Sequence, residues 1–290
     1  TLLDELRKLS WASADVLMAY ARGEEPPYGF PKSLTVEEGG DGPVSAADMA
    51  VNELLISGLK DNLAFKEWDI LSEETSKEKT FQQDNYKKDW CWILDPLDGT
   101  KDFLQGSENY AVHIALAYKK KPKIGIVLIP EKNELWFGIV GIGAWSENRD
   151  GSKNHFSFSD RLDISKLILV SSKNHQQSKL NNLLSTLCFG KTKKIGSVGC
   201  KVASILRGEA DVYISLSGKT SPKDWDMAAP HALIEAAGGM FSHADGKNLV
   251  YQETNYSQSG CLIASHGKSH EKICQKAMDF FSLEEPKYFV

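Results

Sequence analysis

One stretch organises this chain: Trp90-Cys91-Trp92-Ile93-Leu94-Asp95-Pro96-Leu97-Asp98-Gly99-Thr100-Lys101-Asp102-Phe103. Its first five residues form an apolar, aromatic run, which predicts a buried strand. We expect that strand to stop at Asp95-Pro96, because proline has no N–H to donate to a sheet. Carboxylates at the end of a buried strand are costly unless a positive charge compensates them. A hard divalent cation such as Mg²⁺, which prefers oxygen ligands, is the simplest compensator.

A plain turn is the alternative, because Asp-Pro and Asp-Gly pairs are common in turns. Two further acidic sites favour a metal site: Glu73-Glu74 follows a short apolar run, and Asp224-Trp225-Asp226 opens a helical pattern. Three acidic sites at the ends of separate elements are what a phosphatase with two or three metal ions needs. Gly99 and Thr100 add a flexible backbone and a hydroxyl, which suit a phosphate oxygen or a water.

The three motifs resemble, in order and spacing, those of the lithium-sensitive, magnesium-dependent inositol monophosphatase superfamily. The resemblance covers nearly the whole chain. Asp98-Gly99-Thr100-Lys101-Asp102-Phe103 is most similar to the CysQ-type 3'(2'),5'-bisphosphate nucleotidases, which typically have Glu at the position of Asp102. Inositol monophosphatases usually carry Thr-Asn after Asp-Gly-Thr. The resemblance implies a layered α/β (α+β) fold, the α-β-α-β-α sandwich of the sugar phosphatases.

The resemblance also implies a cofactor, two or three Mg²⁺ ions. One ion would be held by Glu74, Asp95 and the carbonyl of Leu97. A second ion would be held by Asp95, Asp98 and Asp226. The acidic loop 37–42 can carry ligands for a third ion in this superfamily, and the role of Glu73 is left open.

Three residues would serve catalysis by resemblance: Asp48, Thr100 and Glu74. Asp48 would hydrogen-bond Thr100, which orients the attacking water, and the N–H groups of Gly99 and Thr100 would contact the phosphate. The alternative for Asp48 is a helix cap, since Ser45-Ala46-Ala47-Asp48 is a capping box, and both roles can hold together. The alternative for the paired glutamates is a solvated surface.

The rest of the substrate would be bound by a set of polar residues, in addition to Gly99, Thr100 and Asp226. Each of these residues could instead have no part in binding: the histidine could be a solvent-exposed loop residue, the small residues a plain Gly/Ser helix cap, and the lysines solvated side chains. Small residues at 196–199 open a helix whose N-terminal N–H groups favour an anion. The candidates are Lys101, His175, Ser197, Lys201 and Lys219.

Composition bounds the remaining possibilities. The 290 residues include 34 basic and 39 acidic side chains, a net charge of −5, so no basic field for nucleic acid or an acidic membrane exists. Five cysteines without a CxxC pair argue against a disulfide framework and against zinc. No membrane span or signal peptide is visible. We expect a cytoplasmic protein that acts on a small phosphate ester, as a monomer or a homodimer.

Hydrophobic periodicity predicts helices on an antiparallel sheet in the first half and alternating strands and helices in the second. Helices are expected at 2–22, 46–62, 177–187, 196–207, 226–237 and 267–281. We place a first half at 1–155 and a second half at 156–290, which completes the active site.

The function that these inferences favour is Mg²⁺-dependent hydrolysis of the 3'-phosphate of 3'-phosphoadenosine 5'-phosphate (PAP), giving AMP. The nearest alternative is an inositol monophosphatase or another sugar phosphatase, including fructose 1,6-bisphosphatase. A catalytically silent magnesium-binding scaffold is the alternative from another class.

Overall fold

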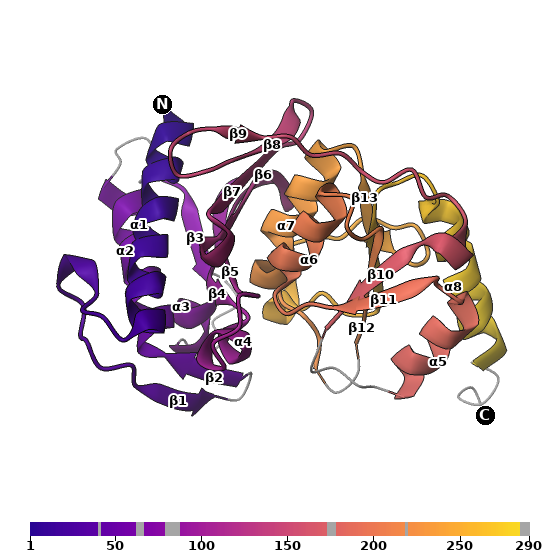
Figure 1. Ribbon diagram of the computed structural model, residues 1–290, viewed down its shortest axis with the longest axis horizontal. Coiled ribbons are helices and arrows are strands. Elements are labelled where there is room, and N and C mark those ends of the chain that lie inside the picture. The colour runs from indigo at the N-terminus through magenta and orange to yellow at the C-terminus, as the bar shows by residue number, and fades with distance from the viewer. Residues whose placement is uncertain (40–41, 62–66, 79–87, 173–177, 218–219, 285–290) are drawn as a thin grey trace.

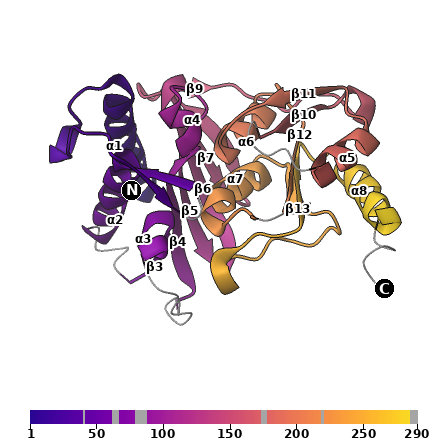
Figure 2. The same ribbon diagram turned by 90° about the horizontal axis from the view of Figure 1, so that it is seen from below.

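The computed structural model describes residues 1–39, 42–61, 67–78, 88–172, 178–217 and 220–284. Five layers follow one another across the molecule (Figure 1): two helices, a sheet, two helices, a second sheet and two more helices. This confirms the expected α-β-α-β-α arrangement. The same order is visible from below (Figure 2), where α6 and α7 lie between the two sheets.

The first sheet has seven strands in the order β3-β4-β5-β6-β7-β8-β9. It is antiparallel except for the parallel pair β3–β4. One face is covered by α1 (Leu2–Arg22) and α2 (Ala46–Asp61), whose apolar residues join the core beneath them. The strands are β3 (Asp69–Ser72), β4 (Trp90–Asp98), β5 (Ala111–Tyr118), β6 (Lys121–Ile129), β7 (Glu134–Ile139), β8 (Gly143–Glu147) and β9 (Lys153–Asn154).

The second sheet has five strands in the order β11-β10-β12-β14-β13. It packs between the middle helices, α6 (Val198–Leu206) and α7 (Asp224–Ala236), and the outer helices, α5 (Ser178–Leu187) and α8 (His270–Glu284). The strands are β10 (Ile168–Ser171), β11 (Lys191–Lys194), β12 (Val212–Leu216), β13 (Met240–His243) and β14 (Cys261–Ser265). Because β9 ends at Asn154 and β10 begins at Ile168, the two sheets draw on separate parts of the chain.

The expectation that the first motif strand stops at Asp95-Pro96 is wrong. Strand β4 continues to Asp98, and its pairing with β5 shifts register between Asp95 and Asp98. An irregularity of this kind leaves residues out of the ladder, so the missing N–H of Pro96 is tolerated there. Both aspartates therefore lie within one strand rather than in a turn after it.

Several short elements near the motifs were not expected. Strands β1 (Val36–Gly39) and β2 (Gly42–Ser45) pair antiparallel on either side of residues 40 and 41, which lie outside the described residues and inside the expected loop 37–42. Glu73 is the first residue of helix α3 (Glu73–Glu78), and α4 (Thr100–Leu104) follows the central motif. Both helices are too short for a periodic pattern to reveal them. Single-turn 3₁₀ helices lie at Pro27–Gly29, Pro130–Lys132, Ile164–Lys166 and Thr254–Tyr256.

Helix α7 packs directly on the first sheet because β6 has a glycine, Gly125, at the contact. A Cβ atom at Gly125 would lie 2.3 Å from the carbonyl oxygen of Ala229, which no side chain could accept. The missing side chain therefore allows the backbones to approach closely. This contact brings the N-terminal turn of α7, with Asp226, to the end of β4. In the described part of the chain, no helix is both long and apolar enough to cross a membrane.

Candidate active site

Three carboxylates meet where β4 ends against α7. Asp95, Asp98 and Asp226 each offer an oxygen, and these oxygens lie within 4.8 Å of one another. Asp95 and Asp98 are buried, and Asp226 is partly buried. Asp224, in the same motif, is engaged elsewhere: it accepts hydrogen bonds from the Gln252 N–H (2.6 Å) and Gln258 Nε2 (2.7 Å). The structure thus brings together the three aspartates that the sequence assigned to one metal ion.

The charge of this cluster fits a bound cation. Oδ2 of Asp95 is buried and has no hydrogen-bond partner among the described residues. Burial, followed by repulsion from Glu73, Asp98 and Asp226, raises the pKa of Asp95 well above its usual range. Two unit charges 4 Å apart interact by about 4 kcal/mol near a protein surface. Without protons or a cation between them, these carboxylates would repel strongly, and an all-oxygen set is what Mg²⁺ prefers.

The contacts favour Glu73 over Glu74 as the fourth carboxylate. The negative charge of Glu73 raises the pKa of both Asp95 and Asp226. Glu74, the next residue, is buried. The two glutamates begin a helix, so their side chains point about 100° apart. The sequence argument used the strand end, which does not distinguish them.

Thr100 and Asp48 form the expected hydrogen bond. Thr100 Oγ1 lies 3.0 Å from Asp48 Oδ1 and 3.1 Å from the carbonyl oxygen of Leu97. A hydroxyl has one hydrogen to donate and can still accept from a water. Oδ2 of Asp48 accepts from the N–H (2.7 Å) and the hydroxyl (2.5 Å) of Ser45, so the capping role exists as well. Burial raises the pKa of Asp48 to about 6, although these hydrogen bonds oppose the shift.

Ser197 is turned toward a carboxylate of the chain itself. Its Oγ donates to Asp98 Oδ2 (2.7 Å), and the N–H groups of Val198 (2.5 Å) and Gly199 (3.3 Å) reach the same oxygen. The N-terminus of α6 therefore does favour an anion, but that anion is Asp98. The resemblance implies that this helix end binds the substrate, which stays a prediction; in the structure it holds Asp98, a candidate metal ligand.

Lys201 lies inside this region. The residue is 3% exposed, and Nζ lies 5.2 Å from the ring centroid of Tyr213. Burial lowers the pKa of Lys201, and the negative charges of Asp98, Asp102 and Asp226 oppose that shift. The Lys201 side chain therefore lies buried beside these carboxylates.

The other expected substrate residues differ in placement. Lys101 is exposed on α4, and Gly99, with φ 94°, caps that helix in a conformation that suits glycine. His175 and Lys219 lie outside the described residues.

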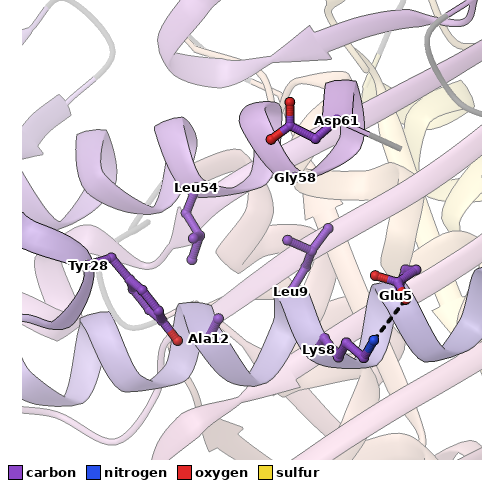
Figure 3. Close-up of a pocket in the computed structure, with 8 residues that line it drawn as sticks. All are labelled: Glu5, Lys8, Leu9, Ala12, Tyr28, Leu54, Gly58 and Asp61. Carbon is purple, nitrogen blue, oxygen red and sulfur yellow. Dashed lines mark hydrogen bonds and ion pairs between the residues drawn. The ribbon is translucent and has the colours of Figure 1, made fainter. Parts of the chain in front are cut away.

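A groove of about 510 Å³ runs between α1 and α2 (Figure 3). Its floor is apolar, with Leu9, Ala12 and Leu54, and Tyr28 and Asp61 lie at its ends. None of the carboxylates of the cluster lines it. The groove is therefore separate from the candidate active site.

Sequence reasoning missed His113. This residue lies in the apolar run of β5, is fully buried, and places Nε2 3.2 Å from Asp98 Oδ2. The available signal was a single polar ring within an otherwise apolar strand.

Comparison with known proteins gives consistent results. A model of the inositol monophosphatase family matches residues 3–280. The chain is 30% identical over 250 residues to the 3'(2'),5'-bisphosphate nucleotidase CysQ of Salmonella typhimurium, covering 86% of this chain and 94% of that protein. The solved structure of an IMPase from Thermotoga maritima superimposes with a TM-score of 0.74 at 21% identity, covering 97% and 98% of the two chains. An IMPase/NADP phosphatase complexed with Mg²⁺ and phosphate gives a TM-score of 0.66 at 22% identity, covering 84% and 86%.

Proposed function

The chain belongs to the inositol monophosphatase family and is a phosphatase of that family; we propose that it hydrolyses the 3'-phosphate of PAP to give AMP and phosphate with Mg²⁺ as cofactor. One observation supports the metal-dependent reaction above all others. The oxygens of Asp95, Asp98 and Asp226 converge within 4.8 Å beside the hydrogen-bonded pair Thr100–Asp48.

We assign the metal ligands as Asp95, Asp98 and Asp226, with Glu73 in the role that the sequence gave to Glu74. The carbonyl of Leu97 remains a proposed ligand. Its oxygen lies 3.1 Å from Thr100 Oγ1, the hydroxyl that would orient the attacking water. A bound divalent cation would neutralise the phosphate charge and lower the pKa of a water. The IMPase/NADP phosphatase of the same fold, whose structure is complexed with Mg²⁺ and phosphate, supports the choice of ion.

Asp48 and Thr100 would orient the attacking water. Ionised Asp48 accepts the hydroxyl hydrogen of Thr100, so a lone pair on Thr100 Oγ1 is free to accept a hydrogen from that water. Ser45 fixes the Asp48 carboxylate through two hydrogen bonds. Asp48 and Thr100 together would therefore activate a water as the nucleophile, so the reaction requires no covalent enzyme intermediate.

The choice of a bisphosphate rests on cations and on similarity. Lys201, buried beside the carboxylates, would bind a phosphate of the substrate. Lys101, His175 and Lys219 remain proposed contacts. The relatedness to a 3'(2'),5'-bisphosphate nucleotidase at 30% identity favours this substrate over inositol phosphates.

The test is phosphate release with Mg²⁺ from PAP and from inositol 1-phosphate at equal, low concentration. We expect a strong preference for PAP. A preference for inositol phosphate would overturn the substrate assignment and leave the metal site standing. Turnover of neither substrate would overturn the proposed function. Lys201→Met is the matched variant: it should raise KM for PAP more than KM for a monophosphate.

A further inference from the structure

We propose that His113 is a positioning residue that holds the metal-binding carboxylates of the two halves in register, an inference that rests on the function proposed above. The ring lies at the junction of three elements that carry the candidate site: the end of β4, the start of α6 and the start of α7.

The position of His113 follows from the register of the first sheet. Its Cα pairs with that of Asp95 in the β4–β5 ladder. From there the ring reaches Asp98 on one side, with Nε2 3.2 Å from Oδ2. On the other side, Nδ1 lies 3.3 Å from the carbonyl oxygen of Trp225, the residue before Asp226. One side chain thus spans from a carboxylate of the first half to the backbone beside a carboxylate of the second.

The environment of the ring leaves it little freedom. His113 is 0% exposed, and a Cβ atom at Gly199 would lie 2.4 Å from Nε2 and 2.7 Å from Val127 Cγ1. Gly199 also donates its N–H to Asp98 Oδ2. The absent side chain at 199 therefore lets the imidazole and the helix end approach the same carboxylate from two directions.

The chemistry of the contacts points to a role for Nε2. This nitrogen has no hydrogen bond of good geometry to the described residues, and an unpaired buried polar group is destabilising. The carboxylate of Asp98 is the compensating group within reach. Groups that hold metal-ligating side chains from behind typically change metal affinity about 10- to 100-fold when they are removed.

Two variants separate the two contacts of the ring. Both neighbours are acceptors, and a neutral imidazole carries a single N–H, so it donates to only one of them at a time. The amide of His113→Gln reaches as far as Nε2 and can donate to Asp98. The shorter amide of His113→Asn reaches only as far as Nδ1, toward Trp225. His113→Leu removes both contacts.

The experiment is direct titration with Mn²⁺, followed by electron paramagnetic resonance, on metal-free protein. We expect His113→Leu and His113→Asn to bind at least about tenfold more weakly than the wild type, and His113→Gln to stay within about threefold. Unfolding temperatures in EDTA should remain close to that of the wild type, which separates positioning from folding. Gly199→Ala, which displaces the ring without changing it, should weaken binding like His113→Leu and covers the case in which a His113 variant fails to fold.

The controls distinguish the positioning role of His113 from the proposed metal-dependent function. If the wild type binds Mn²⁺ and Asp98→Asn does not, the metal site stands; equal binding by His113→Leu would then overturn this inference alone. Tight binding by His113→Asn together with weak binding by His113→Gln would also overturn it, because the contact to Trp225 would be the one that matters. Absence of binding by the wild type would contradict the proposed function itself.

Discussion

Asp48 Oδ1 and Thr100 Oγ1 lie 3.0 Å apart, and this hydrogen bond joins the start of α2 to the central motif 52 residues later. The ionised carboxylate of Asp48 is a stronger acceptor for the Thr100 hydrogen than the protonated acid. Its pKa, raised by burial, decides at which pH this pair operates.

The pH profile of turnover should therefore show an acid limb near pH 6. Below the Asp48 pKa of about 6 the carboxyl is protonated and loses the negative charge that draws the Thr100 hydrogen, so kcat at saturating Mg²⁺ should fall as the pH is lowered. Asp48→Asn should lower kcat by about 10²- to 10⁴-fold. Ser45→Ala removes a hydrogen bond that stabilises the ionised form, so it should move the limb to higher pH. A limb at the same pH in Ser45→Ala would show that Asp48 is not the group that titrates.

The two glutamates of α3 make a matched pair. Glu73→Gln should raise the Mg²⁺ concentration needed for half-maximal activity by at least about tenfold, because the charge acting on Asp95 and Asp226 is removed. Glu74→Gln should have the smaller effect. The measurement is activity against Mg²⁺ concentration for both variants. The opposite ranking would return the ligand role to Glu74.

Asp95→Asn should lower turnover at least about 100-fold, because a central ligand is lost. The same change removes a buried charge that repels its neighbours, so the metal-free protein should unfold at the same temperature or slightly higher. Calorimetry in EDTA and phosphate release with Mg²⁺ test the two statements. Full activity in Asp95→Asn would refute the assignment of the cluster.

Stability should decrease in mild acid through His270. Burial lowers the pKa of His270 from 6.5 to about 4, and its two ring nitrogens contact the hydroxyls of Ser242 and Ser265, both at 2.8 Å. Between these pH values the unfolded chain takes up a proton and the folded chain does not, so the free energy of unfolding falls as the pH drops from 6.5 to 4. The loss is about 3 kcal/mol at most for a shift of this size.

The comparison variant is His270→Gln, which cannot titrate. Its free energy of unfolding in urea should change less between pH 7 and pH 5 than that of the wild type. The other buried histidines, His113, His231 and His266, are present in both proteins, so their contributions cancel in the difference. Equal changes in the two proteins would show that His270 does not carry the effect.

Local patterns predicted most of the elements. The helix expected at 2–22 is Leu2–Arg22, and the helix expected at 226–237 is Asp224–Ala236. The errors lie at the site: β4 continues through Pro96, and Glu73 begins a helix. A bulge and a six-residue helix are both stabilised by neighbouring elements rather than by a periodic pattern of their own.

By itself, the sequence determined on which elements most of the acidic side chains lie, because apolar periodicity, caps and strand ends depend on near neighbours. The selection of Asp95, Asp98 and Asp226 as candidate metal ligands came from the resemblance of their motifs to those of a known family. Only the tertiary structure decided what surrounds them. Ser197 reaches Asp98 across 99 residues, and His113 reaches Trp225 across 112. Such contacts depend on the phase of each helix and on how closely α6 and α7 pack against the sheet, which no local stretch of sequence encodes.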